Sequence, residues 1–141
     1  MTTEDGYILT VWRIKHGNNT SSDAPNKKVV FFQHGLLATG HSFVCNHPEH
    51  TVTFLLANAG YDVWIGNNRG CYFGRNHTTL DPNKDNGFWD FSWEEMGRYD
   101  VRNQIKYVKQ QTGAPKVGYV GHSEGTIQMF FSLEEYEEEL S

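Results

Sequence analysis

Short apolar runs and stretches of helical periodicity alternate along most of the chain. Residues 29–32 form a continuous apolar run, and residues 61–65 and 116–120 are rich in β-branched and aromatic side chains. An uninterrupted apolar run, unlike an alternating one, is typical of a strand buried on both faces of a parallel sheet. We therefore predict three central strands, one at each of these positions.

The longest predicted helix has the clearest start signal in the sequence. Ser92 and Glu95 form a capping box, with the serine as N-cap and the glutamate at the third helical position. The helix is predicted to run to about residue 111 and to stop at residues 112–115, Thr-Gly-Ala-Pro. Side chains at a spacing of three or four should face the sheet, namely Met96, Tyr99 or Asp100, Val101, Ile105 and Val108.

Two further helices are predicted on either side of it in the chain. Residues 52–59 have an apolar face and are followed by Gly60, which suits the position just after a helix end. The last helix is expected to begin near Thr126 and to end in the acidic, solvated residues 134–139.

The amino-terminal region is predicted to be a hairpin over residues 2–14, with Asp5-Gly6 as its tight turn. Residues 16–28 read as a polar loop, and residues 66–89 as a long loop that is functional or carries short elements of its own. Strands that alternate with helices predict an α/β fold with a mostly parallel, doubly wound sheet. The length of 141 residues fits one domain over residues 1–141.

Gly121-His122-Ser123-Glu124-Gly125 lies between a predicted strand and a predicted helix. In that setting, G-x-S-x-G is typical of a nucleophile elbow, in which a serine is held on a sharp, strained turn. The glycines are needed because side chains two residues before and after the serine would collide with the strand and the helix. The alternative is an ordinary strand-to-helix turn with Ser123 as N-cap.

A serine hydrolase also needs two donors for the oxyanion. In this architecture they are backbone N–H groups, one from the residue after the serine and one from the loop after the first central strand. Glu124 and Leu36 occupy those positions, and Leu36 follows His34-Gly35. We expect His34 to be a structural hydrogen-bonding residue. A carboxylate at Glu124 would be unfavourable beside a forming oxyanion unless it points away or is paired.

The catalytic base and acid are not apparent in the sequence. They are expected in the order serine, acid, histidine, yet no histidine or aspartate follows Ser123. His122 is a neighbour on a sharp turn and should point elsewhere, and Asp100 is expected to fix a nearby loop. The chain by itself is therefore expected to lack the base and acid.

Other kinds of site find little support. His41, His47 and His50 match no standard metal spacing, so neither a metal nor a cofactor is expected. Cys45 and Cys71 are too few for a disulfide framework; one bridge remains an alternative to two free thiols.

A net charge of −5 without a basic cluster argues against nucleic-acid binding. The glycines after residue 117 do not form a dinucleotide-binding motif. No apolar run approaches the ~20 residues that span a bilayer, and no signal-peptide pattern follows the first methionine.

Five blocks of the sequence resemble the acid lipases, the family of gastric lipase, lysosomal acid lipase and the steryl ester hydrolases. These blocks occur in family order and comprise residues 3–9, 33–38, 56–70, 88–100 and 119–126. The resemblance implies a partial α/β-hydrolase fold with Ser123 as nucleophile and the Leu36 and Glu124 amides as the oxyanion hole. The family usually has glutamine where Glu124 stands.

The resemblance also implies a function. It points to a carboxylic ester hydrolase of lipid metabolism, acting on triacylglycerols or steryl esters through a serine acyl-enzyme, with lipid-surface contact in the full-length parent. Family members are more than twice this length, and their later half carries the lid, the acid and the histidine. The chain is thus expected to be an amino-terminal part of such an enzyme, and the alternative function is that of an inactive fragment. The family suggests a secreted, lysosomal or endomembrane location.

Overall fold

A computed structural model of the chain describes residues 1–18, 20 and 26–140. Its centre is a four-stranded sheet with the order β2-β4-β3-β6. These strands are β2 (Trp12–Ile14), β3 (Val29–Gln33), β4 (Asp62–Ile65) and β6 (Val117–Gly121). β4, β3 and β6 are parallel, whereas β2 pairs with β4 in the antiparallel sense. The sheet is therefore mostly parallel, and the predicted α/β class is confirmed.

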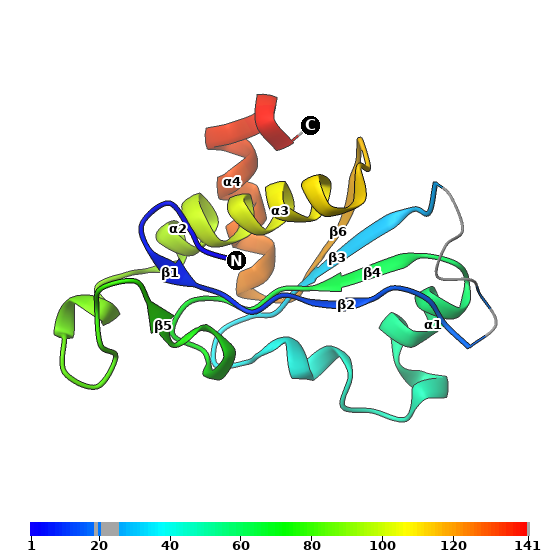
Figure 1. Cartoon of the computed structure of the whole chain (residues 1–141), viewed down its shortest axis with the longest axis horizontal. Coiled ribbons are helices and arrows are strands. Elements are labelled where there is room, and N and C mark those ends of the chain that lie inside the picture. The colour runs from blue at the N-terminus through cyan, green and yellow to red at the C-terminus, as the bar shows by residue number, and fades with distance from the viewer. Residues whose placement is uncertain (19, 21–25, 141) are drawn as a thin grey trace.

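Helices cover both faces of this sheet (Figure 1). They are α1 (Val52–Asn58), α2 (Trp93–Glu95), α3 (Arg102–Thr112) and α4 (Glu124–Leu140), and a π-helical segment, Met96–Val101, joins α2 to α3. Short 3-10 turns lie at Gly40–Phe43, Pro48–His50, Tyr72–Gly74 and Asn86–Trp89. No helix in the described part of the chain is long and apolar enough to cross a bilayer.

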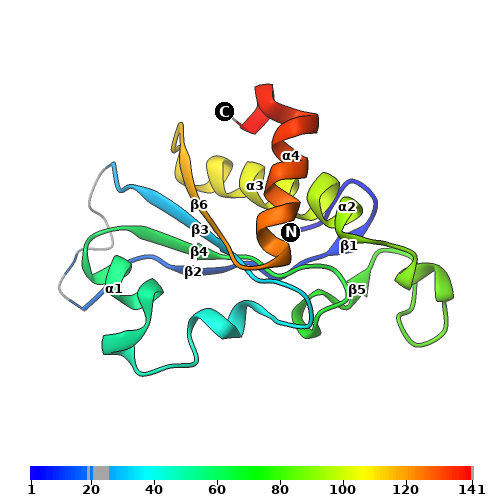
Figure 2. The same cartoon turned by 180° about the vertical axis from the view of Figure 1, so that it is seen from behind.

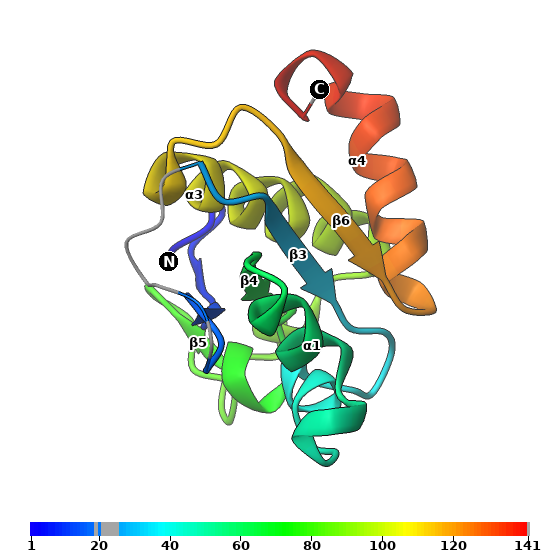
Figure 3. The same cartoon turned by 90° about the vertical axis from the view of Figure 1, so that its right-hand side faces the viewer.

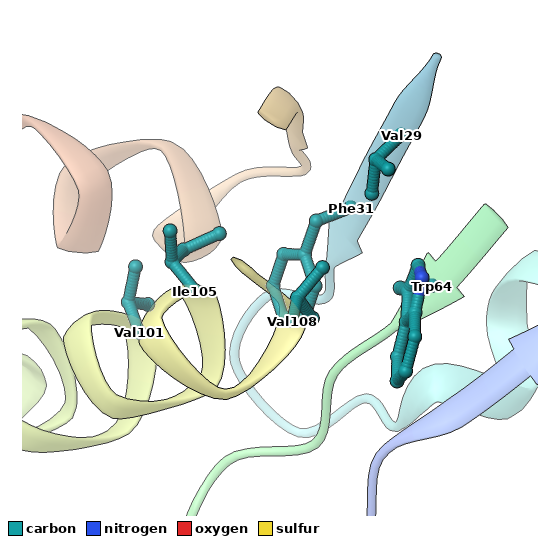
Figure 4. Close-up of a cluster of buried hydrophobic side chains, with 6 residues drawn as sticks. All are labelled: Val29, Phe31, Trp64, Val101, Ile105 and Val108. Atoms are coloured by element: carbon teal, nitrogen blue, oxygen red, sulfur yellow. The ribbon is translucent and has the colours of Figure 1, made fainter. Parts of the chain in front are cut away.

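The core around the main sheet consists of one apolar layer on each face of β3 and β4, and a smaller cluster joins Tyr7, Leu9 and Phe88. On one face, Phe31 and Trp64 belong to a cluster with side chains of α3 and of the π-helical segment (Figure 4). The whole cluster comprises Val29, Phe31, Trp64, Val101, Ile105 and Val108. On the other face the cluster is Val30, Phe32, Ala57, Val63 and Ile65, with Ala57 contributed by α1. Successive strand residues point to opposite faces, so continuous apolar runs at residues 29–32 and 63–65 supply both layers.

The predicted long helix is helical over residues 93–112, but its central turn is π rather than α. The capping box at Ser92 and Glu95 is present, and Gly113 ends the run with a φ of 67°. A capping box and a glycine stop report on the two ends of a helix. They carry no signal for the extra residue that a π turn accommodates in the middle.

The predicted amino-terminal hairpin is partly wrong. Asp5-Gly6 does form a turn, and Thr2 bridges Ile8 across it. The following segment is not one strand, however, because β1 (Tyr7–Ile8) pairs with β5 (Asn76–His77), while β2 joins the main sheet. β5 belongs to the long loop 66–89, which thus carries short elements as predicted. The polar loop predicted at residues 16–28 lies partly outside the described residues.

Candidate active site

Ser123 sits on a sharp turn between β6 and α4. Figures 2 and 3 show β6 running directly into this turn and the chain turning back as α4. The serine has a φ of 54°, in the left-handed region that residues with a Cβ rarely adopt. Such strain is held only where the surrounding structure fixes it. The backbone therefore has the strained geometry predicted for a nucleophile elbow, and the catalytic role of Ser123 stays a prediction.

Both glycines of the motif are required by close contacts. A Cβ at Gly121 would lie 2.8 Å from the backbone nitrogen of Thr126, and a Cβ at Gly125 would lie 2.6 Å from the carbonyl oxygen of Gln33. These distances are shorter than real Cβ contacts allow. Gly121 therefore allows the strand to turn tightly into α4, and Gly125 allows the elbow to approach the end of β3.

Replacing Gly125 by alanine is expected to lower the free energy of unfolding by about 2–3 kcal/mol, since the added methyl group meets rigid backbone. In an ordinary helix, the same change is favourable by roughly 1 kcal/mol. Gly87→Ala is the matched control, because an added Cβ there has no atom within 4 Å. Urea unfolding of both variants measures the difference. Equal, small effects at the two positions would contradict the close approach.

Hydrogen bonds tie the elbow to its surroundings. The His122 N–H donates to the Gln33 carbonyl at 3.0 Å and so joins the turn to the end of β3. The Tyr119 hydroxyl donates to the Gly125 carbonyl at 2.7 Å, and the Thr126 hydroxyl donates to the Gly121 carbonyl at 3.1 Å. The turn is thus fixed from the strand, from the helix and from the neighbouring loop.

The loop after β3 packs directly against the nucleophile. A Cβ at Gly35 would lie 2.8 Å from the Ser123 Cβ and 3.3 Å from the Glu124 nitrogen. The backbone N–H groups of Leu36 and Glu124 donate no hydrogen bond to any described residue, and Glu124 is the first residue of α4, where N–H groups have no partner within the helix. The two predicted oxyanion donors therefore lie in segments that touch at Ser123, and both are free to donate.

His34 is buried beneath this loop. Its Nε2 accepts the Asn68 N–H at 3.1 Å, so the ring proton lies on Nδ1 and is donated to the Gly35 carbonyl at 2.9 Å. Burial lowers the pKa of His34, although the bond to Gly35 acts in the opposite direction. Both ring nitrogens are thus occupied by backbone partners. This arrangement supports the structural role predicted for His34.

Because the pKa of His34 is lower in the folded chain, the unfolded chain binds more protons below about pH 6.5. Stability from this residue is thus complete above pH 6.5 and is lost as the pH falls toward the folded-state pKa, by at most about 1.4 kcal/mol per pH unit. Urea unfolding of the wild type and of His34→Gln between pH 7.5 and 5 isolates this contribution. Parallel stability curves for the two proteins would refute it.

A cavity of about 520 Å³ opens beside the elbow. Its walls come from the loop after β3, from residues 68–72, from residues 89–96 and from the first residue of α4. Most of the lining is apolar or aromatic, and includes Leu36, Leu37, Tyr72, Trp89, Phe91 and Met96. A largely apolar pocket with a few polar groups is the usual form of a small-molecule site.

A buried polar cluster anchors one wall of this cavity. The Asp100 carboxylate accepts the Arg69 backbone N–H and Nε–H, both at 2.8 Å, and the Arg69 guanidinium also pairs with Asp5 at 2.7 Å. Asp100 fixes the neighbouring loop, as predicted. The sequence pattern did not predict the bonds from Arg69 to Asp100 or from the Asn68 N–H to His34. Polar residues at the carboxyl end of a parallel strand are nevertheless a signal for a site.

The described residues provide no base for Ser123. His122 is exposed and has no hydrogen bond from its ring, and both nitrogens of His34 are engaged. No group of three or more histidine, cysteine, aspartate or glutamate side chains in the described chain could hold a metal ion. Cys45 and Cys71 are free thiols.

Two family models and a solved structure support the fold described above. Residues 28–141 match a family model described as alpha/beta hydrolase fold, and residues 1–47 match a partial alpha/beta-hydrolase lipase region. A crystal structure from Sulfolobus solfataricus superposes with a TM-score of 0.60 at 16% identity, covering 97% of this chain and 44% of that one. At this level of identity the superposition supports the fold alone.

Closer sequence relatives are lipases. Lipase member K of Mus musculus is 45% identical over 93% of this chain and 33% of its own length. Lysosomal acid lipase/cholesteryl ester hydrolase of Homo sapiens is 46% identical over 96% of this chain and 34% of its own length. The chain therefore spans about a third of the length of these relatives.

Proposed function

Because the chain belongs to the alpha/beta hydrolase fold family, we propose that it carries the nucleophile and the oxyanion hole of a carboxylic ester hydrolase that acts on lipid esters. One observation supports this more than any other. Ser123 has a φ of 54° at the turn between β6 and α4, in contact with the loop that bears the Leu36 N–H. Ser123 is exposed, and the N–H groups of Leu36 and Glu124 beside it donate no hydrogen bond to any described residue.

In the proposed reaction, the Ser123 Oγ attacks the carbonyl carbon of the ester while a base takes its proton. Negative charge develops on the carbonyl oxygen, and the N–H groups of Leu36 and Glu124 donate to it. The alcohol leaves with a proton returned by the base, which gives an acyl-enzyme. A water molecule then attacks the acyl carbon, releasing the fatty acid and restoring the serine. The reaction needs no metal or cofactor.

The base and the acid are proposed to come from outside residues 1–141. No described histidine ring forms a hydrogen bond with the Ser123 side chain, and the lipase relatives are about three times as long as this chain. Residues 1–141 would then form the amino-terminal part of a single hydrolase domain. The position of β6 at the edge of the sheet, with Val120 exposed, agrees with this proposal.

A triacylglycerol or a steryl ester is the proposed substrate. The apolar lining of the cavity suits an acyl chain, and the names of the relatives include lipase and cholesteryl ester hydrolase. Exposed apolar side chains surround the cavity, with Leu36 at 66%, Leu37 at 99% and Tyr72 at 80% exposure. Apolar residues on a surface in this way suit contact with a lipid phase.

The second candidate is a chain that binds lipid esters without hydrolysing them. The observation in its favour is the lack of a described group that could take the Ser123 proton.

A chimera distinguishes the two candidates. In this lipase graft, residues 1–141 replace the aligned part of human lysosomal acid lipase/cholesteryl ester hydrolase, and turnover of p-nitrophenyl octanoate is measured beside the 141-residue chain alone. The proposal predicts turnover by the graft and background rates for the chain. A folded graft without turnover would favour the binding function.

A further inference from the structure

Two charged residues line the cavity, Arg69 and Glu124. The Arg69 guanidinium is nearly inaccessible and is held by Asp100 and Asp5 at 2.7–3.0 Å. Since its positive charge is matched by these two carboxylates, Arg69 offers no free cation to a ligand in the cavity.

Glu124 is different, because its carboxyl group has no hydrogen-bond or ion-pair partner among the described residues. The side chain is partly buried, and burial raises the pKa of Glu124. Glu124 lines the cavity next to the loop after β3, since its backbone nitrogen would lie 3.3 Å from a Cβ at Gly35. An unpaired charge beside apolar walls acts over several ångströms, since screening is weaker there than in water.

We propose that the Glu124 side chain makes this cavity selective for neutral head groups and against carboxylates. An ester is neutral, whereas the fatty acid released from it is anionic above its own pKa. The carboxylate of Glu124 would repel that product from the place where the ester carbonyl binds, and so would favour its release. The inference rests on the proposed function, since it assigns the acyl ester to the same cavity.

The selectivity has a cost. The charge that repels a carboxylate also destabilises the oxyanion, whose negative charge is stabilised only by the two backbone N–H groups. With glutamine at this position, the oxyanion would form without that repulsion. The cavity would then no longer discriminate against the fatty acid product. Glu124→Gln therefore isolates the effect of the charge with little change of shape.

The test compares two ligands of equal chain length, 1-octanol and octanoate, at pH 8 and low ionic strength. Binding to the 141-residue chain is followed by calorimetry for the wild type, Glu124→Gln and Glu134→Gln. Glu134 is the matched control, because it lies exposed on α4 ten residues away from Glu124, which is about 15 Å along a helix. Thermal unfolding checks that each variant is folded.

We expect Glu124→Gln to tighten octanoate binding about tenfold, a change of about 1.4 kcal/mol, and to change 1-octanol binding less than twofold. Glu134→Gln should alter neither ligand. If 1-octanol binds and Glu124→Gln leaves the octanoate affinity unchanged, or if both variants change it equally, the selectivity proposal is wrong and the proposed function stands. If 1-octanol does not bind the wild type, the assignment of the acyl chain to this cavity fails, and both proposals fall.

Discussion

Ser123→Ala is expected to lower the turnover of p-nitrophenyl octanoate by the lipase graft about 10⁵-fold. The serine is the only protein group in the proposed reaction that forms a bond to the acyl carbon, and loss of a serine nucleophile removes covalent catalysis entirely. The oxyanion donors Leu36 and Glu124 are backbone groups and remain in the variant, so a small residual rate above that of water is expected.

The matched control for this prediction is Ser42→Ala. Ser42 is exposed and lies outside the cavity, so its replacement should leave the rate within about twofold. Since alanine at position 123 still has to adopt a positive φ, unfolding is measured alongside the kinetics to separate stability from catalysis. If the folded Ser123→Ala graft kept a tenth or more of the activity, Ser123 would not be the nucleophile.

Asp100→Asn is expected to lower the free energy of unfolding of the 141-residue chain by about 3 kcal/mol. Removal of one partner from a buried ion pair costs roughly 3–5 kcal/mol, because the other charge is left without compensation. Burial raises the pKa of Asp100 to about 6, although the charge of Arg69 acts in the opposite direction. This value still lies below neutral pH, where the carboxyl group is therefore mainly ionised. Asp5 still pairs with Arg69 in the variant, which places the effect at the lower end of that range.

Urea unfolding at pH 7.5 measures this loss. Asp81→Asn serves as the control, because Asp81 and Lys84 form an exposed pair at 3.2 Å, and exposed pairs contribute little to stability. A similar effect of the two substitutions would show that the Arg69 cluster does not anchor the structure.

The central strands and the ends of the helices could be predicted because their signals are local. The apolar run at residues 29–32 needs no partner to be recognised, and the Ser92 capping box and Gly113 mark helix ends within a few residues. The pairing of β1 with β5 could not be predicted in the same way. It joins Tyr7 to His77 across 70 positions of the chain, and a two-residue strand has no periodicity of its own.

The same distinction applies to the candidate site. The turn at Ser123 was predicted from five consecutive residues, and the steric demand on Gly121 is local, because a Cβ there would meet Gly125 and Thr126. The demand on Gly125 comes instead from Gln33 and His34 at the end of β3. The cavity depends on four segments that are far apart in the sequence. The anchor of its wall depends on contacts between Arg69, Asp100 and Asp5 that no local pattern encodes.

Covalent trapping tests the central claim most directly, namely that Ser123 is the nucleophile. The lipase graft is treated with a p-nitrophenyl alkylphosphonate, and the adduct is located by intact mass and peptide mapping. We predict one phosphonyl group per chain, attached to Ser123, with turnover lost in proportion to labelling and no labelling of Ser123→Ala. Inactivation with the adduct on another residue, or equal labelling of Ser123→Ala, would contradict the account.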